Sequence, residues 1–285
     1  MIRFRVIKGS HVLLAIAVLA LCAVIAVILL QGALPEQQAA LKPIPTAGAE
    51  VLSTFASSAL LESKLKIEVL PDPTPSPIPV HGKRILIYHT HTHEAYAQVE
   101  HDPYVAVEAW RTEDSEHSVV RLGRALADAL QALGYEVTHD TTDHEQQEIS
   151  SAYVRSLETL ESYKSEFDLT IDLHRDAYVE GLPLSCEADG KECAQLMLLV
   201  GRGDQYTGED KPDYEGNLAF AQQLTSAMNA KSEGICRNIT VKKGRYNQHI
   251  GRKAILVEVG HNQNTLEQAL NSIPCLAQAL HTVLT

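Results

Sequence analysis

The chain has 285 residues and a formal net charge of −12, with 36 acidic against 24 basic side chains. This length is enough for one domain together with additional segments. The excess of acidic residues argues against nucleic acids and anionic lipid surfaces as partners.

The N-terminus combines a basic tail with a long apolar run. Residues 1–11 contain basic but no acidic side chains, and residues 12–30 are 19 consecutive apolar residues. A run of this length spans a bilayer, and basic residues mark its cytoplasmic side. We therefore expect a cytoplasmic tail, a single transmembrane helix over residues 12–31 and a location in the cell membrane, with the remaining chain extracytoplasmic. A cleaved signal peptide is the alternative, because Gly32-Ala33 supplies small residues nearby.

A stalk and a proline-rich linker follow over residues 32–79. The segment Pro71-Asp-Pro-Thr-Pro-Ser-Pro-Ile-Pro79 has prolines at every second position, which favours an extended polyproline conformation. This spacer predicts a domain boundary, with an extracytoplasmic domain over residues 80–285.

Within that domain, apolar strands alternate with amphipathic helical segments, which is typical of an α/β fold. We expect a mostly parallel sheet flanked by helices. The expected strands are residues 85–88, 135–138, 169–173, 195–200 and 254–259, and the expected helices are residues 118–133, 151–164, 214–231 and 265–283.

Four of the five cysteines lie outside the apolar run, and an even number in an extracytoplasmic domain permits disulfides. Cys186 and Cys193 flank Asp189-Gly190, a pair that favours a hairpin turn. We expect a small hairpin closed by a Cys186–Cys193 disulfide. Cys236 and Cys275 are the other candidate pair.

The segment Ile85-Leu-Ile-Tyr-His-Thr-His-Thr-His-Glu94 is an apolar strand that ends in three alternating histidines and a carboxylate. Imidazoles and carboxylates at the carboxyl end of a strand are the groups that a catalytic zinc needs. Three solvated histidines on a polar surface strand are the alternative interpretation.

Two further strands favour the metal site. Residues 169–173, Leu-Thr-Ile-Asp-Leu, lead into His174, and Glu258 lies inside the otherwise apolar strand expected over residues 254–259. A carboxylate in such a strand is costly to bury unless a cation or hydrogen bonds compensate it. Together the three strands indicate a metal hydrolase site at one edge of an α/β sheet.

Five motifs spread through the domain resemble the stage II sporulation protein P family. They are Tyr88-His-Thr-His-Thr-His-Glu-Ala-Tyr96, Glu116-His-Ser-Val-Val-Arg-Leu-Gly123, Asp172-Leu-His-Arg-Asp176, Lys243-Gly-Arg-Tyr-Asn-Gln248 and Leu256-Val-Glu-Val-Gly-His-Asn-Gln-Asn-Thr-Leu-Glu267. The resemblance implies a membrane-anchored, zinc-dependent N-acetylmuramoyl-L-alanine amidase that degrades peptidoglycan during sporulation engulfment, beside a lytic transglycosylase partner.

The resemblance also assigns roles to individual residues. His91, Glu94 and His174 match the family's metal ligands and should bind Zn²⁺, and Glu258 matches its general base. The third ligand has alternatives, since the wider amidase group draws its glutamate from farther along the chain. Glu116 and His117 are the candidates there.

Three more residues receive roles from their positions. Asp172 shares a strand face with His174 by alternation and could orient its ring, or could be a surface or capping carboxylate. Arg245 could bind a carboxylate of the stem peptide and Asn247 its backbone amides, or both could belong to a solvated loop.

Two other functions compete with the amidase. A zinc peptidase acting on the stem peptide needs a similar ligand set, and a membrane-tethered scaffold could bind cell wall without cleaving it. The ligand set together with Glu258 favours an enzyme.

Overall fold

The computed structural model describes residues 82–163, 167–207 and 210–285. The predicted tail, transmembrane helix, stalk and linker lie outside these residues. In the described ranges, no helix has both the length and the apolar composition needed to cross a bilayer.

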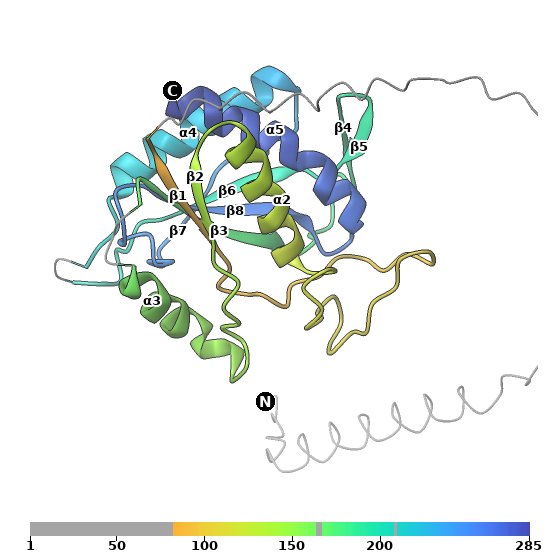
Figure 1. The fold of residues 1–285 in the computed structure, drawn as a ribbon, viewed down its shortest axis with the longest axis horizontal. Helices are drawn as coiled ribbons and strands as arrows, with labels where there is room; N and C mark the ends of the chain where they lie inside the picture. Colours follow the sequence, from red (N-terminus) through yellow and green to blue (C-terminus); the bar gives the residue numbers. More distant parts are fainter. Residues whose placement is uncertain (1–81, 164–166, 208–209) are drawn as a thin grey trace, which may run out of the picture. The chain divides into compact units, whose positions relative to one another are not determined.

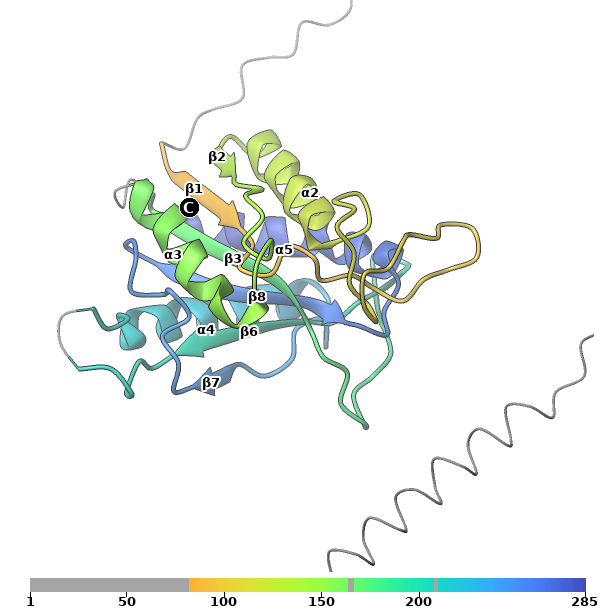
Figure 2. The same cartoon turned by 90° about the horizontal axis from the view of Figure 1, so that it is seen from below.

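A six-stranded sheet forms the centre of the domain (Figure 1). Its order is β2-β1-β3-β8-β6-β7, and Figure 2 shows the strands running from β2 and β1 at one edge to β7 at the other. The bounds are β1 Arg84–Tyr88, β2 Glu136–His139, β3 Leu169–Asp176, β6 Leu196–Gly201, β7 Thr240–Lys242 and β8 Ala254–His261. The first four strands in this order are parallel, whereas β6 pairs antiparallel with β8.

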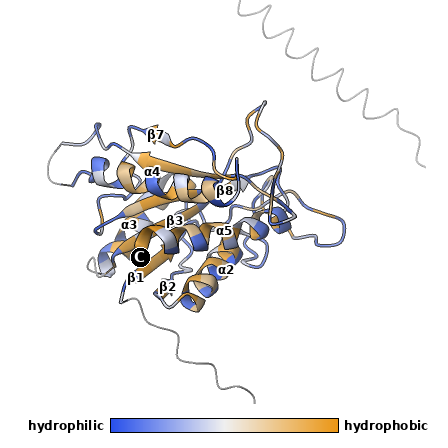
Figure 3. Ribbon diagram, turned by 90° about the horizontal axis from the view of Figure 1, so that it is seen from above, coloured by the Kyte–Doolittle hydropathy of each residue, from blue (hydrophilic) through white to orange (hydrophobic). Residues whose placement is uncertain are grey.

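Four helices cover the sheet unequally. Helices α2, α4 and α5 pack on one face, and α3 packs on the other with a much smaller apolar cluster (Figure 1). Figure 3 shows that the strands between them are almost entirely hydrophobic, as expected for a sheet buried on both faces. The helix bounds are α2 Val119–Ala132, α3 Ala152–Ser162, α4 Tyr214–Lys231 and α5 Leu266–Leu284, and a single 3₁₀ turn covers Ile149–Ser151.

Helix starts follow local capping chemistry. The Ser118 side chain accepts a hydrogen bond from the backbone N–H of Val120 at the start of α2. At α5, Thr265 and Gln268 form a reciprocal capping box. The predicted starts of α2 and α5 lie within one residue of these caps.

The predicted α/β fold with a mostly parallel sheet is confirmed, with three differences in detail. The direction of β6, which runs antiparallel to β8, was not assigned from the sequence, and β7 was not predicted. Strands β3 and β8 also continue past their expected ends. Antiparallel β6 was missed because a buried apolar run does not reveal its direction.

The predicted hairpin is present as β4, Cys186–Ala188, and β5, Lys191–Cys193. Asp189 and Gly190 both have positive φ, 51° and 72°, which a two-residue type I′ turn requires. Cys186 and Cys193 are direct partners across the two strands, but both thiols are free in the structure. The disulfide stays a prediction.

A pair of histidines, the buried His89 and the half-buried His139, joins the end of β1 to β2. Nε2 of His89 lies 2.9 Å from Nε2 of His139, and Nδ1 of His89 lies 2.8 Å from the carbonyl oxygen of Leu173. Gly123 of α2 makes room for both rings, because a Cβ there would lie 2.4 Å from Nε2 of His139. Burial and the neighbouring His139 lower the pKa of His89 to about 3. Burial and the nearby Arg124 lower the pKa of His139 to about 4.

We expect this pair to make the fold less stable in weak acid. Both histidines have lowered pKa values in the fold, so their stabilising contribution is complete above the unfolded pKa of about 6.5 and is lost progressively below it. His139→Gln keeps an N–H donor for His89 but does not titrate. Urea titrations at pH 7 and pH 5 give the loss of unfolding free energy between these two pH values. We expect this loss to be smaller in His139→Gln than in wild type, by on the order of 1 kcal/mol. His101→Gln, at an exposed position, should match wild type, and an equal loss in His139→Gln would contradict the assignment.

Candidate active site

The candidate site lies at the carboxyl ends of β1, β3 and β8. Alternation along these strands turns their odd-numbered residues toward the large apolar core, which contains Leu173 and Val257. His174 and Glu258, the neighbours of these residues in sequence, therefore lie on the opposite face, the side of α3. They are direct register partners on adjacent strands.

The segment that follows β1 brings two more predicted metal ligands, Glu94 and His91, close to His174. Nδ1 of His174 lies 3.4 Å from Oε2 of Glu94, and the rings of His91 and His174 meet edge-on with centroids 5.5 Å apart. The backbone N–H of Arg175 donates to the same oxygen of Glu94 over 2.9 Å. The structure thus brings together the three predicted ligands.

Two carboxylates flank the buried ring of His174. Oδ1 of Asp172 lies 2.8 Å from Nε2 of His174, although the N–H does not point along this line, and Glu94 lies on the Nδ1 side. Burial lowers the pKa of His174, but the charges of Asp172 and Glu94 outweigh burial and hold the pKa well above its usual value. The arrangement favours a positive charge between these carboxylates.

Asp172 lies beside His174, where strand alternation predicted it. Its carboxylate also accepts from the backbone N–H and the hydroxyl of Thr90, over 2.8 Å and 2.7 Å. Burial raises the pKa of Asp172, yet His174 and Thr90 hold it below its ordinary value. Asp172 is therefore a fixed, ionised partner for the imidazole.

Glu145 holds the ring of His91, as Asp172 lies beside that of His174. This role of Glu145 was not predicted. Oε1 of Glu145 lies 2.7 Å from Nδ1 of His91 and accepts from Arg111 over 2.7 Å, and Oε2 accepts from the backbone N–H of His93. Burial raises the pKa of Glu145, but these three contacts lower it to about 2. With Nδ1 engaged, Nε2 is the nitrogen of His91 left for a ligand. Glu145 lies in a loop without periodicity, so no sequence pattern pointed to it.

Glu258 is in a different electrostatic state from its neighbours. It is 9% exposed, and its Oε2 has no hydrogen-bond partner among the described residues. Burial raises the pKa of Glu258 to about 8, with Glu94 and Asp176 adding to the rise against His174 and Arg175. An ionised carboxylate here needs a nearby cation.

The donor set fits a zinc ion, although the described part of the chain contains no group of three or more His, Cys, Asp or Glu side chains already arranged around a common point. Two imidazoles and a carboxylate are common zinc ligands, and each imidazole has a carboxylate beside its second nitrogen. Oε2 of the buried Glu258, which has no hydrogen-bond partner among the described residues, lies on the strand next to His174.

The alternative third ligands lie elsewhere. Glu116 pairs with Arg121 and Arg124 at the surface, and His117 is held by Asp102 and Asp114. The geometry therefore favours Glu94 over Glu116 or His117.

The ring of His93 is engaged by a different carboxylate from that of His91. Its Nε2 lies 3.0 Å from Oδ2 of Asp143.

The two predicted substrate-binding residues lie on one loop but differ in environment. Asn247 is 4% exposed, and its amide donates to the carbonyl of Tyr153 and the hydroxyl of Ser156. Arg245 and Asn247 both line a cavity of about 340 Å³, together with Tyr153 and Tyr246. The side-chain amide of Asn247 is already bonded to α3, whereas the guanidinium of Arg245 is at the cavity wall.

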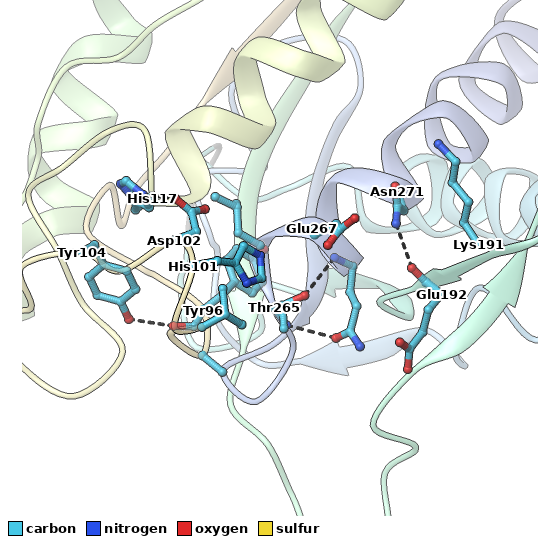
Figure 4. Close-up of a pocket in the computed structure, with 14 residues that line it drawn as sticks. Tyr96, His101, Asp102, Tyr104, His117, Lys191, Glu192, Thr265, Glu267 and Asn271 are labelled. Carbon is cyan, nitrogen blue, oxygen red and sulfur yellow. Dashed lines mark hydrogen bonds and ion pairs between the residues drawn. The ribbon is translucent and has the colours of Figure 1, made fainter. Parts of the chain in front are cut away.

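A cavity of about 470 Å³ lies at the start of α5 (Figure 4). Tyr104, Asp102 and His117 line one side of it, and Glu192 and Asn271 the other. None of the predicted ligands lines this cavity.

Comparison with known proteins identifies the family. The sequence model of the stage II sporulation protein P (SpoIIP) family matches residues 57–281. The chain belongs to the SpoIIP family. It is 28% identical over 204 residues to stage II sporulation protein P of Bacillus subtilis (strain 168), an overlap that covers 65% of this chain and 47% of that protein. The chain therefore spans about half the length of this relative.

Solved structures similar to this chain include two amidases. The N-acetylmuramyl-L-alanine amidase Ami1 from Mycobacterium abscessus is 12% identical with a TM-score of 0.45, covering 72% of this chain and 99% of that one. The amidase AmiC2 of Nostoc punctiforme is 14% identical with a TM-score of 0.42, covering 71% and 94%.

The contact between Glu145 and His91 generates a prediction about metal affinity. Glu145→Gln replaces a carboxylate that holds Nδ1 of His91 with a neutral amide, so the ring loses its orientation and basicity. We expect the affinity for zinc to fall about 10-fold to 100-fold. Competition titration with a chromogenic chelator measures this change. Glu148→Gln, at an exposed position of the same loop, should bind zinc like wild type, and an unchanged affinity in Glu145→Gln would exclude the role.

Proposed function

We propose that this protein is a zinc-dependent N-acetylmuramoyl-L-alanine amidase that hydrolyses the amide between the glycan and the stem peptide of peptidoglycan. The observation that carries the proposal is the convergence of His91, Glu94 and His174 beside a buried Glu258 on the adjacent strand. Membership in the SpoIIP family supports the substrate class and a part in sporulation.

In this proposal His91, Glu94 and His174 hold the zinc ion. When bound to three protein ligands, zinc polarises a carbonyl and lowers the pKa of water to about 7. Glu145 and Asp172 keep the two imidazoles in place through their second nitrogens. Binding of the metal requires neutral His174, so it should release the proton that the surrounding carboxylates favour.

Glu258 is the proposed general base. It accepts a proton from the attacking water and passes it to the nitrogen of the leaving L-alanine. Its unpaired Oε2 is free for this proton, whereas Glu94 is engaged by Arg175. A carboxyl group with a pKa near the working pH is suited to transfer in both directions.

The setting of the reaction is part of the same proposal. The predicted helix over residues 12–31 would anchor the domain in the cell membrane, with the site facing the cell wall. A membrane-anchored lytic transglycosylase would be its partner in sporulation, cutting glycan strands while this protein removes their peptides.

Digestion of purified muropeptides tests the proposed bond. The full chain with zinc should release intact stem peptides beginning with L-alanine and leave peptide-free glycan, and a chelator should prevent both. Cleavage within the stem peptide would instead indicate a zinc peptidase. Binding to cell wall without release of peptide would indicate a scaffold.

The ligand assignment predicts loss of metal in three variants. His91→Ala, His174→Ala and Glu94→Ala each remove one of three protein ligands, so each should lose both bound zinc and hydrolysis. Mass spectrometric metal analysis after dialysis gives the readout. His93→Ala is the matched control from the same motif and should keep its zinc. Full zinc occupancy in any of the three variants would remove that residue from the ligand set.

A different failure is expected for the base. Glu258→Gln preserves shape but cannot accept a proton, so zinc should remain bound while turnover falls by roughly 100-fold or more. Parallel metal analysis and single-turnover hydrolysis separate the two effects. Zinc loss would make Glu258 a ligand, and near-normal turnover would exclude it as the base.

A further inference from the structure

A cavity of about 340 Å³ lies next to the candidate site and shares a wall with it. The shared residue is Tyr153, the second residue of α3. Its ring meets the ring of His91 edge-on at 5.7 Å and the ring of Tyr246 at 5.7 Å. Only the Tyr153 ring would therefore separate a molecule in this cavity from His91, a proposed zinc ligand.

The loop on the other side of the cavity has an unusual backbone. Tyr246 and Asn247 both have φ of 50°, in the left-handed region that side chains other than glycine rarely adopt. Two such residues in succession cost free energy, and such strain persists where the surrounding structure fixes it, often at functional sites.

Buried polar contacts fix this loop. The amide of Asn247 donates to the carbonyl of Tyr153, and Gln248 accepts from the backbone N–H of Gly201 over 2.8 Å. Gly201 has no room for a side chain, because a Cβ there would lie 2.4 Å from the carbonyl oxygen of Gly244. The loop is held rigidly against α3 and β6, and its rigidity positions Arg245.

Arg245 brings a positive charge into this aromatic cavity. Its guanidinium carbon lies 4.5 Å from the centre of the Tyr206 ring, and Nη1 pairs with Asp210. The Arg245 side chain is 17% exposed, whereas that of Asp210 is 52% exposed. A guanidinium has five N–H donors, so Nη2 and Nε remain for a second carboxylate.

We propose that this cavity binds the stem peptide and that Arg245 recognises the free carboxylate of the residue after L-alanine. The inference rests on the proposed amidase function. In that substrate the lactyl carboxyl group is consumed by the scissile amide, which leaves the N-acetylated glycan uncharged near the bond. The peptide carries the carboxylates, beginning with the α-carboxylate of D-glutamate. A cavity of this size accommodates one or two amino-acid residues.

Two substrates that differ in one charge test this inference. They are a glycan-linked stem peptide with the D-glutamate α-carboxylate and the same peptide with that group amidated. The full chain with zinc should prefer the acidic substrate by about 10-fold or more in kcat/KM. Arg245→Gln should abolish the preference by losing activity on the acidic substrate alone.

Two further variants separate recognition from loop structure. Asp210→Asn removes the competing carboxylate and should keep or increase the preference. If Arg245 serves only to hold the loop through Asp210, this variant should instead fail as Arg245→Gln does, and the inference is overturned. Arg202→Gln, a matched surface arginine paired with Asp204, should behave as wild type. A preference that survives in Arg245→Gln also overturns the inference.

Binding of the free peptides distinguishes this inference from the proposed function. Calorimetry with the acidic and amidated peptides needs no turnover. An Arg245-dependent preference in binding, with no cleavage of either substrate by wild type, would refute the amidase and leave the peptide site standing. Cleavage of the amide without any Arg245-dependent preference would refute the peptide site and leave the amidase standing.

Discussion

Charge balance around one buried imidazole governs the candidate site. His174 lies between Asp172 and Glu94, and burying two carboxylates on this face would be prohibitive without a positive charge between them. The charges of Asp172 and Glu94 hold the pKa of His174 well above its usual value, which favours the protonated imidazole, and the charge of Arg175 also acts on Glu94. The remaining contacts, from Thr90 and from the backbone of Arg175, fix the carboxylates rather than neutralise them.

The helices cover the two faces of the sheet unequally, and the buried charged groups of the candidate site lie on the less covered face. Three long helices, α2, α4 and α5, close one face of the sheet with the large apolar core. On the other face, α3 contributes Leu160 to a small cluster with Leu86 and Tyr88. At the carboxyl ends of the central strands on that side, Glu94 and Glu145 come from loops, and Tyr153 comes from the first turn of α3.

Much of this arrangement could be predicted because it follows from strand periodicity. Alternation placed Asp172 and His174 on one face, and an apolar strand interrupted by Glu258 indicated a buried carboxylate. Glu145 could not be predicted, because it reaches His91 from a loop whose path depends on tertiary packing. The same holds for Tyr153, which looks like an ordinary aromatic residue of an amphipathic helix until the fold sets its ring against His91. Sequence patterns report which face a residue occupies, but not which distant loop meets it.

The two glutamates of the site show how environment separates chemical roles. Burial raises the pKa of Glu94, yet His174 and Arg175 outweigh it and keep the pKa below its ordinary value. Glu258, one strand away, lacks a hydrogen bond on Oε2, and burial raises its pKa to about 8. A permanently ionised carboxylate is suited to hold a cation, whereas one that titrates near neutral pH is suited to move a proton. Carboxylates whose pKa values are driven apart in one site are the usual mark of such a division. The geometry agrees with the proposed roles, since Oε2 of Glu94 lies 3.4 Å from Nδ1 of His174, whereas Oε2 of Glu258 has no hydrogen-bond partner among the described residues.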